Sequence, residues 1–286
     1  MNYPGILPIG ATLAEGWRLF CAGLVRAFPW ILAAEMLPLL EMSTTPKSVL
    51  NEDLGQFFNP LHLGLALSVG CLQALLYGIA IIQLARLANN DEFTPLLAAV
   101  RSIPALLIGY LIYELIVFLG LGIALLLFLP TALFIGVTVG VLVTLIPLAP
   151  TAYISTALAL FAYPAVLERK GPFAALTRSA QLTRSNWGRA ALVISIPAIV
   201  LLAIAAGNEI PFIEGLHTAM QQLANRSSGL DISQLQNLLS NPKISGHAAQ
   251  PVGWTILFSV LTAFGWWYTL AVCYAEYREL SRSLAH

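Results

Sequence analysis

The chain has 286 residues, of which 58% are hydrophobic and only 10% are charged. Soluble domains carry roughly 25% charged residues, so this composition argues against a soluble globular protein. The formal net charge is zero, which gives no electrostatic reason to expect a nucleic-acid partner. The four histidines and three cysteines never fall at metal-ligand spacing, so we expect neither a metal nor another cofactor.

Six apolar segments are predicted to cross a membrane as helices, which makes the chain an all-α, polytopic membrane protein. A helix needs about 20 apolar residues to span the roughly 30 Å hydrocarbon core of a bilayer. Residues 102–167 contain a single charged side chain, Glu114, and are long enough for at least two spans. In chain order, the predicted spans are residues 27–45, 61–85, 103–128, a fourth that begins after Pro130 and ends near Leu167, 190–207 and 252–274.

Two prolines, Pro147 and Pro150, interrupt the fourth predicted span in the sequence LIPLAP. Proline has no amide hydrogen to donate within a helix, so a kink or a break is expected there. One interpretation is a kink whose free backbone groups are satisfied by neighbouring helices. The other is an unwound segment that lines a substrate site, as in many transporters.

The basic residues predict which side of the membrane each connection faces. Three of them, Lys47, Arg226 and Lys243, fall on one side of the predicted spans, and all the others fall on the opposite side. Because positive residues flank the cytoplasmic ends of spans, both termini are expected in the cytoplasm. The residues on the predicted cytoplasmic side are Arg18, Arg26, Arg86, Arg101, Arg169, Lys170, Arg178, Arg184, Arg189, Arg278 and Arg282.

Weak internal repeats divide a single membrane domain, residues 1–286, into three units. Each unit is expected to be a short amphipathic helix followed by two spans. The units cover residues 9–90, 94–170 and 172–286. The two clearest copies are offset by 77 residues and pair Pro95 with Pro172, Arg101 with Arg178, and Ser102 with Ser179.

The amphipathic helix of the third unit is the clearest of the three. Arg178 and Arg189 are predicted to lie on its polar face, on which Leu182 also falls. A basic helix of this kind lies in the cytoplasmic interface and contacts anionic headgroups, and the alternative is a packed elbow that positions the next span. Its apolar stripe consists of Phe173, Leu176, Ala180, Thr183 and Trp187. The candidate headgroup ligands are Arg101, Arg178, Arg184 and Arg189.

The loop between the last two spans, residues 208–250, is predicted to hold two amphipathic helices on the outer side. Asp231 is positioned to cap the second of them, with Gln234 at the capping-box position. These helices either cover the outer mouth of the bundle like a lid or lie on the outer surface.

The segment VLERKGPFAALTRSAQLTRSNWGRA, residues 166–190, resembles a signature of the YciC-type bacterial inner-membrane proteins. The membrane domain attached to some glycerophosphodiester phosphodiesterases is similar. The closing residues 273–281 also resemble the end of these proteins. The resemblance implies six spans, cytoplasmic termini and a bacterial inner membrane, but no catalytic residue and no phosphodiesterase activity. It is carried by Glu168, Gly171, Pro172, Ala175, Leu176, Arg178, Ser179 and Leu182.

Glu114 is the main candidate for chemistry inside the membrane. It lies about 17 Å into the third predicted span at roughly 1.5 Å per residue, near the midplane. An ionisable group there is costly, so it is a functional hypothesis by default. Gln73 is predicted at a similar depth and can hydrogen-bond to it, Tyr110 lies one turn away, and Glu35 is a second candidate acid. Two such acids either relay protons or hydrogen-bond helices together.

These features favour a non-enzymatic membrane protein that engages lipids or envelope components. The alternative is a small-molecule or proton-coupled transporter or channel that uses Glu114, Gln73 and the break at Pro147 and Pro150. An intramembrane enzyme has little beyond the two acids to recommend it. The expected partners are membrane lipids, with anionic lipids favoured, and a homo-oligomer is compatible with the sequence.

Overall fold

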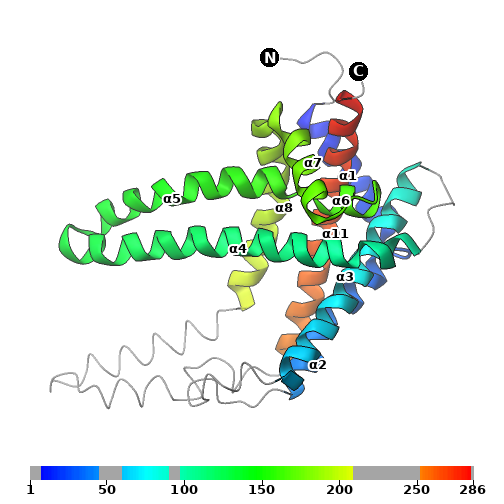
Figure 1. Cartoon of the computed structure of the whole chain (residues 1–286), viewed down its shortest axis with the longest axis horizontal. Coiled ribbons are helices and arrows are strands. Elements are labelled where there is room, and N and C mark those ends of the chain that lie inside the picture. The colour runs from blue at the N-terminus through cyan, green and yellow to red at the C-terminus, as the bar shows by residue number, and fades with distance from the viewer. Residues whose placement is uncertain (1–7, 45–59, 90–96, 209–251, 285–286) are drawn as a thin grey trace.

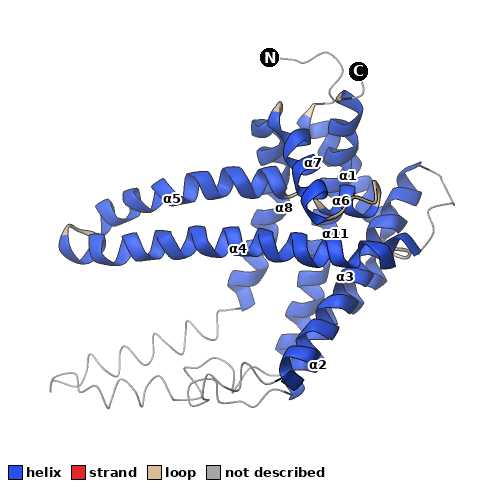
Figure 2. Cartoon of the chain, in the orientation of Figure 1, coloured by secondary structure: helices blue, strands red, loops and turns tan. Residues whose placement is uncertain are grey.

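A computed structural model describes residues 8–44, 60–89, 97–208 and 252–284, which form helices joined by turns (Figures 1 and 2). This confirms the predicted all-α class. The helices are α1 (Ile9–Gly23), α2 (Phe28–Thr44), α3 (Pro60–Asn89), α4 (Leu97–Phe134), α5 (Val137–Leu158), α6 (Ala162–Val166), α7 (Pro172–Arg184), α8 (Trp187–Asn208) and α11 (Val252–Ser283).

Five stretches of the described chain are helical, long and apolar enough to cross a membrane. They are α3, α4, α8, α11 and the pair of α5 and α6, and each corresponds to a predicted span. Helices α1 and α2 meet the same criterion only together, and the chain bends by 81° between them. The chain is therefore a polytopic membrane protein by the length and apolarity of its helices. The predicted outer helices of residues 208–250 lie, apart from Asn208, outside the described residues, and the three-unit repeat stays a prediction.

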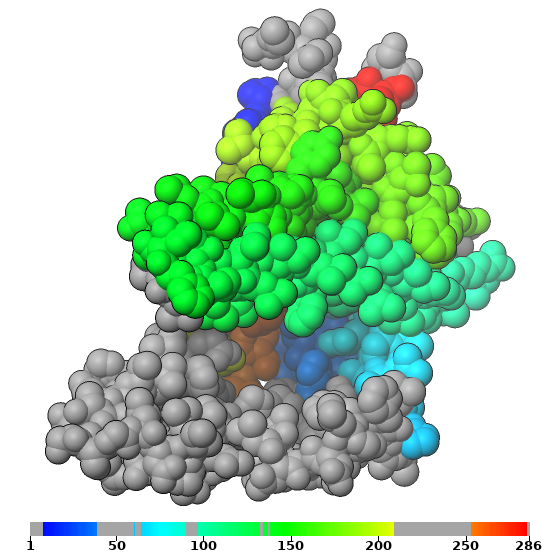
Figure 3. All heavy atoms as spheres, turned by 60° about the vertical axis from the view of Figure 1, so that its left-hand side comes forward, coloured from blue at the N-terminus to red at the C-terminus, as the bar shows by residue number. Residues whose placement is uncertain are grey.

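Helices α4 and α5 form an antiparallel hairpin that runs across the other long helices instead of alongside them (Figures 1 and 3). Gly136 lies at the tip with φ +129°, a conformation that other residues rarely adopt. The amide groups of Ile135 and Gly136 donate to the Thr131 carbonyl at 2.9 and 3.1 Å, which closes the end of α4. Gly120 on α4 faces Thr151 on α5 so closely that a Cβ atom would collide with it. The hairpin is thus held together by its own closely packed helices.

Helix α5 continues through Pro147 and Pro150, so the unwound segment is wrong and the interpretation as a helix that tolerates its prolines holds. The Thr151 hydroxyl donates to the Pro147 carbonyl at 2.7 Å, within the same helix. The helix ends instead at Leu158, before the short helix α6.

Burial changes along α11 near Trp266. From Trp267 to Leu280 most side chains are buried, as expected for a tightly packed core. Trp267 is fully buried, and its indole N–H donates to the Phe20 carbonyl at 3.0 Å. Toward the other end of α11, large apolar side chains are exposed, namely Ile256, Leu257, Leu261 and Phe264.

Helix α3 shows the same change at the same height. The Tyr77 ring packs edge-on to the Trp266 ring, with centroids 6.3 Å apart. On one side of Tyr77, residues 80–82 are buried, and on the other side Leu65, Leu67 and Leu72 are exposed. We call the height of Tyr77 and Trp266 the boundary level. The packed core lies on the side of this level where α1 begins and α11 ends, which we call the core end (Figure 1).

Helix α7 buries a face that matches the predicted stripe only in part: Leu176 and Thr183 are buried as predicted. Phe173, predicted on the apolar stripe, is 70% exposed, whereas Leu182, predicted on the polar face, is 1% exposed. The helix ends at Arg184, so Trp187 belongs to α8 and does not extend the stripe. The buried face consists of Ala175, Leu176, Ser179, Leu182 and Thr183.

Candidate functional site

A network of charged side chains lies at the core end, where α11 meets α1, α3, α7 and α8. Its members come from segments far apart in the sequence, and three acids organise it. We call it the charged network. Its residues are Thr12, Glu15, Arg18, Glu168, Lys170, Arg178, Arg189, Glu276, Tyr277 and Arg278.

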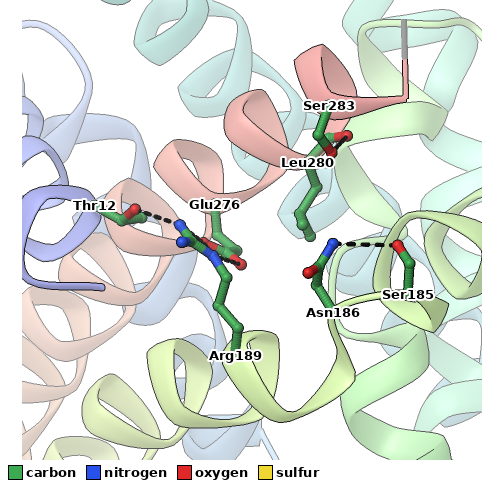
Figure 4. A network of polar contacts seen from close by, with 7 residues as sticks. All are labelled: Thr12, Ser185, Asn186, Arg189, Glu276, Leu280 and Ser283. Carbon is green, nitrogen blue, oxygen red and sulfur yellow. Dashed lines mark hydrogen bonds and ion pairs between the residues drawn. The ribbon is translucent and has the colours of Figure 1, made fainter. Parts of the chain in front are cut away.

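The most buried part of the network joins α8, α11 and α1 through Arg189 (Figure 4). The Glu276 side chain is fully buried, and that of Arg189 is 13% exposed. Arg189 donates from Nε to Glu276 Oε1 at 3.0 Å and from Nη2 to Glu276 Oε2 at 3.0 Å, a two-pronged arrangement. Its Nη2 also donates to the Thr12 hydroxyl at 2.7 Å. Paired, charge-assisted hydrogen bonds of this kind are stronger and more directional than neutral ones.

A second group of contacts joins α11 to α1 and α3 through Arg278. Its Nη2 donates to Glu15 Oε1 at 2.9 Å, and its Nη1 to the Ala88 carbonyl at 3.4 Å. Arg18, one turn after Glu15 on α1, donates to both oxygens of the same carboxylate at 2.8 Å. Glu15 therefore faces two arginines.

Glu168 forms the third group, in the turn between α6 and α7. Its carboxylate lies 2.9 Å from Lys170 Nζ and 3.3 Å from Arg178 Nε, and it accepts a 2.9 Å hydrogen bond from the Tyr277 hydroxyl of α11. Burial raises the pKa of Glu168, but the hydrogen bonds from Lys170 and Tyr277 and the positive charge of Arg178 outweigh it. The pKa of Glu168 therefore lies below its ordinary value of 4.5.

Ser179 fixes α7 against the end of α5. Its hydroxyl donates to the Ala157 carbonyl at 2.8 Å and accepts from the Leu160 amide at 3.2 Å. Ser179 is fully buried, so these bonds satisfy a backbone amide and a carbonyl at the end of a helix. The buried serine thus explains why the face of α7 centred on it turns inward.

The structure separates the four predicted headgroup ligands into two pairs. Arg178 and Arg189 lie inside the charged network and contact Glu168 and Glu276, so their predicted outward orientation is wrong. Arg101 and Arg184 are exposed, and no described residue forms an ion pair with either. Glu276 was not among the predicted residues. It lies two residues after the last predicted span, within the closing segment 273–281, and this position was the signal that could have found it.

The four candidate residues inside the membrane are linked only in part, because Tyr110 interacts with both Glu114 and Glu35, whereas Gln73 contacts neither acid. The Tyr77 hydroxyl donates to Glu35 Oε1 at 2.5 Å, and Gln73 donates to the Ala34 carbonyl at 3.1 Å instead of to Glu114. These contacts join α2 to α3.

Glu114 lies elsewhere, on the exposed surface of α4. It is hydrogen-bonded to Tyr110 on its own helix, and Tyr110 also interacts electrostatically with Glu35. Tyr77, which sequence reasoning did not single out, is thus the side chain that contacts the half-buried acid of α2, Glu35.

The chemistry of the charged network is that of a structural clamp. Each of Glu15, Glu168 and Glu276 forms an ion pair with at least one arginine or lysine, so each carboxylate already has a partner of opposite charge within the protein. Within the described residues, no group of three or more His, Cys, Asp or Glu side chains is placed to hold a metal ion.

The sequence matches no family model, and comparison with curated proteins and solved structures finds no similar protein. The resemblance to YciC-type proteins therefore stays a prediction. Its two segments, residues 166–190 and 273–281, meet in the charged network through the Glu168–Tyr277 and Arg189–Glu276 contacts.

Proposed function

We propose that this protein is a non-enzymatic, multi-pass protein of the bacterial inner membrane that binds anionic lipid headgroups on its cytoplasmic side. The proposal is carried by one observation, the exposure of Arg26 and Arg101 at the boundary level. The membrane class is supported by the long apolar helices of the described chain. The bacterial source and the orientation follow from the sequence resemblance and from the positive-inside rule.

Contacts on both sides of the bundle support the height assigned to these two arginines. Arg26 follows α1 three residues after Gly23, which lies against the Trp267 ring. Arg101 precedes Ser102, whose hydroxyl lies beside Gly78, the residue after Tyr77. Both residues therefore lie near the height at which burial changes, and both side chains are exposed.

Helix lengths support a membrane surface at the same height. Helix α3 has 30 residues and α11 has 32, so at about 1.5 Å per residue both exceed a hydrocarbon core of roughly 30 Å. Residues 60–77 of α3, which lie beyond the boundary level, are about 27 Å long and fit the hydrocarbon. The charged network then lies outside the hydrocarbon, where its charges are less costly.

Among the described residues, the acids of the core end do not compete for these arginines. Glu15, Glu168 and Glu276 are engaged in the charged network, and Glu279 is buried, with an exposure of 6%. The exposed arginines are thus left to attract anions from outside the protein. Each basic residue near an anionic membrane surface contributes about 1 kcal/mol of attraction, and salt weakens it.

The test is a thermal-unfolding titration of the full chain in detergent, with short-chain phosphatidylglycerol or phosphatidylcholine added. A lipid that binds only the folded protein raises its stability in proportion to the logarithm of its concentration. We expect phosphatidylglycerol to stabilise the protein more than phosphatidylcholine does. The R26Q/R101Q variant should bind phosphatidylglycerol about 30-fold more weakly, since two charges of about 1 kcal/mol each are removed.

The matched control is R184Q/R282Q, which removes the same charge from two exposed arginines at the far end of α7 and α11. We expect it to keep the phosphatidylglycerol response. Equal responses to the two lipids in the unmodified protein would overturn the proposal. A loss of affinity that is the same in both variants would show a diffuse effect of net charge and would also overturn it.

A further inference from the structure

We propose that the α4–α5 hairpin does not cross the membrane but lies within the leaflet on the core side, parallel to the membrane plane. The acyl chains of that leaflet surround the hairpin. This inference concerns a different surface from the arginines of the proposed function. It changes the topology from six crossing helices to four, α2, α3, α8 and α11, with one inserted hairpin.

The first observation is the direction of the hairpin. It projects sideways from the bundle and runs across α8 and α11 in two views (Figures 1 and 3). Helices that lie across one another cannot all stand upright in the same bilayer. Because the residues of α3 beyond the boundary level match the hydrocarbon thickness, the bundle defines the upright direction and the hairpin lies flat.

The second observation is the height at which the hairpin leaves the bundle. Ala99 and Ser102 of α4 pack against Gly78 of α3, at the boundary level, and Leu107 packs against Gly70, on the membrane side of it. Farther along, Gly109 lies against Phe161, just before α6. The hairpin therefore starts at the surface inferred for the membrane and lies directly beneath α6 and α7.

The third observation is that the hairpin is apolar all round. In the most apolar 18-residue stretch of each helix, 11% of α4 and 6% of the α5 span are buried inside the protein, against 39% of α11. Such a surface is unfavourable in water, at roughly 25 cal/mol per Å² of apolar area. Helices that are apolar on every side belong in a core or in lipid. Exposed apolar residues of the hairpin include Leu111, Phe118, Leu126, Phe134, Leu142 and Ile146.

The fourth observation is the chemistry of the tip and of Glu114. No charged residue occurs between Glu114 and Glu168, so the tip around Phe134, which is 87% exposed, has nothing to hold it in the opposite headgroup region. In a crossing helix Glu114 would lie near the midplane, where an acid is costly. In a hairpin that lies within one leaflet, Glu114 stays on the core side of the midplane.

An inserted hairpin adds area to one leaflet only. Two helices side by side are about 20 Å wide, and the part of α4 beyond Gly109 is roughly 37 Å long, which gives on the order of 700 Å². The protein thereby acts as a wedge in the leaflet on the core side.

The experiment locates the tip by single cysteines in a background in which Cys21, Cys71 and Cys273 are replaced. Phe134→Cys reports the tip, and Leu126→Cys on the exposed surface of α4 is a second probe in case the first variant does not fold. Each is labelled with bimane in vesicles that carry nitroxide-labelled acyl chains in one leaflet or the other. An impermeant maleimide is applied from either side to the unlabelled proteins. Val25→Cys, 85% exposed near the boundary level, is the reference for the core side.

We expect the tip cysteine to resist the maleimide from both sides and to be quenched by nitroxides in the core-side leaflet only. Reaction from the side opposite the core end, or equal quenching from both leaflets, would show a crossing hairpin and overturn the proposal. Reaction from the core side would place the hairpin in water and would overturn it as well. None of these readouts depends on Arg26 or Arg101, so the hairpin and the headgroup site fail or stand separately.

Discussion

Replacing Arg189 or Glu276 alone should destabilise the protein far more than replacing both. The Glu276 side chain is fully buried, and that of Arg189 is 13% exposed, with two hydrogen bonds of 3.0 Å between them. Removing one partner leaves a buried charge without compensation, which costs about 3–5 kcal/mol of unfolding free energy. Replacing both by apolar side chains of similar size is often close to neutral. We therefore expect R189M and E276M each to lose about 3–5 kcal/mol, and R189M/E276M to be more stable than either.

The assay is equilibrium unfolding of the four proteins by denaturant in detergent micelles, analysed as a double-mutant cycle. R18M is the matched control, because Arg18 is 61% exposed and pairs with Glu15 at the surface. A surface ion pair is worth about 0–1 kcal/mol, so this variant should change little. Additive effects of the two single substitutions, or a cost below about 1 kcal/mol for E276M, would refute the buried-pair reasoning.

Two further outcomes follow from the packing of α1 and from Glu168. G23A should lose about 1–3 kcal/mol of unfolding free energy, because its Cβ collides with the buried Trp267 ring. G10A, whose Cβ meets open space, should be neutral or stabilising. Similar unfolding free energies for the two variants would contradict the close packing of α1 on α11. The pKa of Glu168 is lowered in the folded state, so its contribution is present above pH 4.5 and is lost as the pH falls through the folded pKa. E168Q should therefore flatten the fall in thermal stability between about pH 5 and pH 3, and an unchanged slope would argue against the Glu168 contacts with Lys170 and Tyr277.

Local sequence patterns were enough to predict the helices. Residues 27–45 correspond to α2 (Phe28–Thr44), and residues 190–207 to α8 (Trp187–Asn208). Pro60 was expected near a helix start, and it is the first residue of α3. These predictions succeed because apolar length and terminal residues act within one segment. The prolines of α5 left two interpretations open, and the structure excludes the unwound segment because the helix runs from Val137 to Leu158.

The face that a helix buries could not be predicted in the same way. The stripe assigned to α7 included Phe173 and excluded Leu182, and the structure reverses both. A short helix with small and polar residues on two sides has no dominant apolar face, so the neighbouring helices decide which face is buried. Here the hydrogen bonds of Ser179 to the end of α5 set the orientation.

The sequence alone determined the membrane class, the approximate ends of the apolar helices and the grouping of basic residues along the chain. Only the tertiary structure decided which arginines are engaged and which are exposed. Arg189 is 87 residues from Glu276 and 177 from Thr12, so no local pattern pairs them. The direction of the α4–α5 hairpin is likewise absent from hydropathy, because apolarity records that a helix avoids water but not how the helix is oriented in the bilayer.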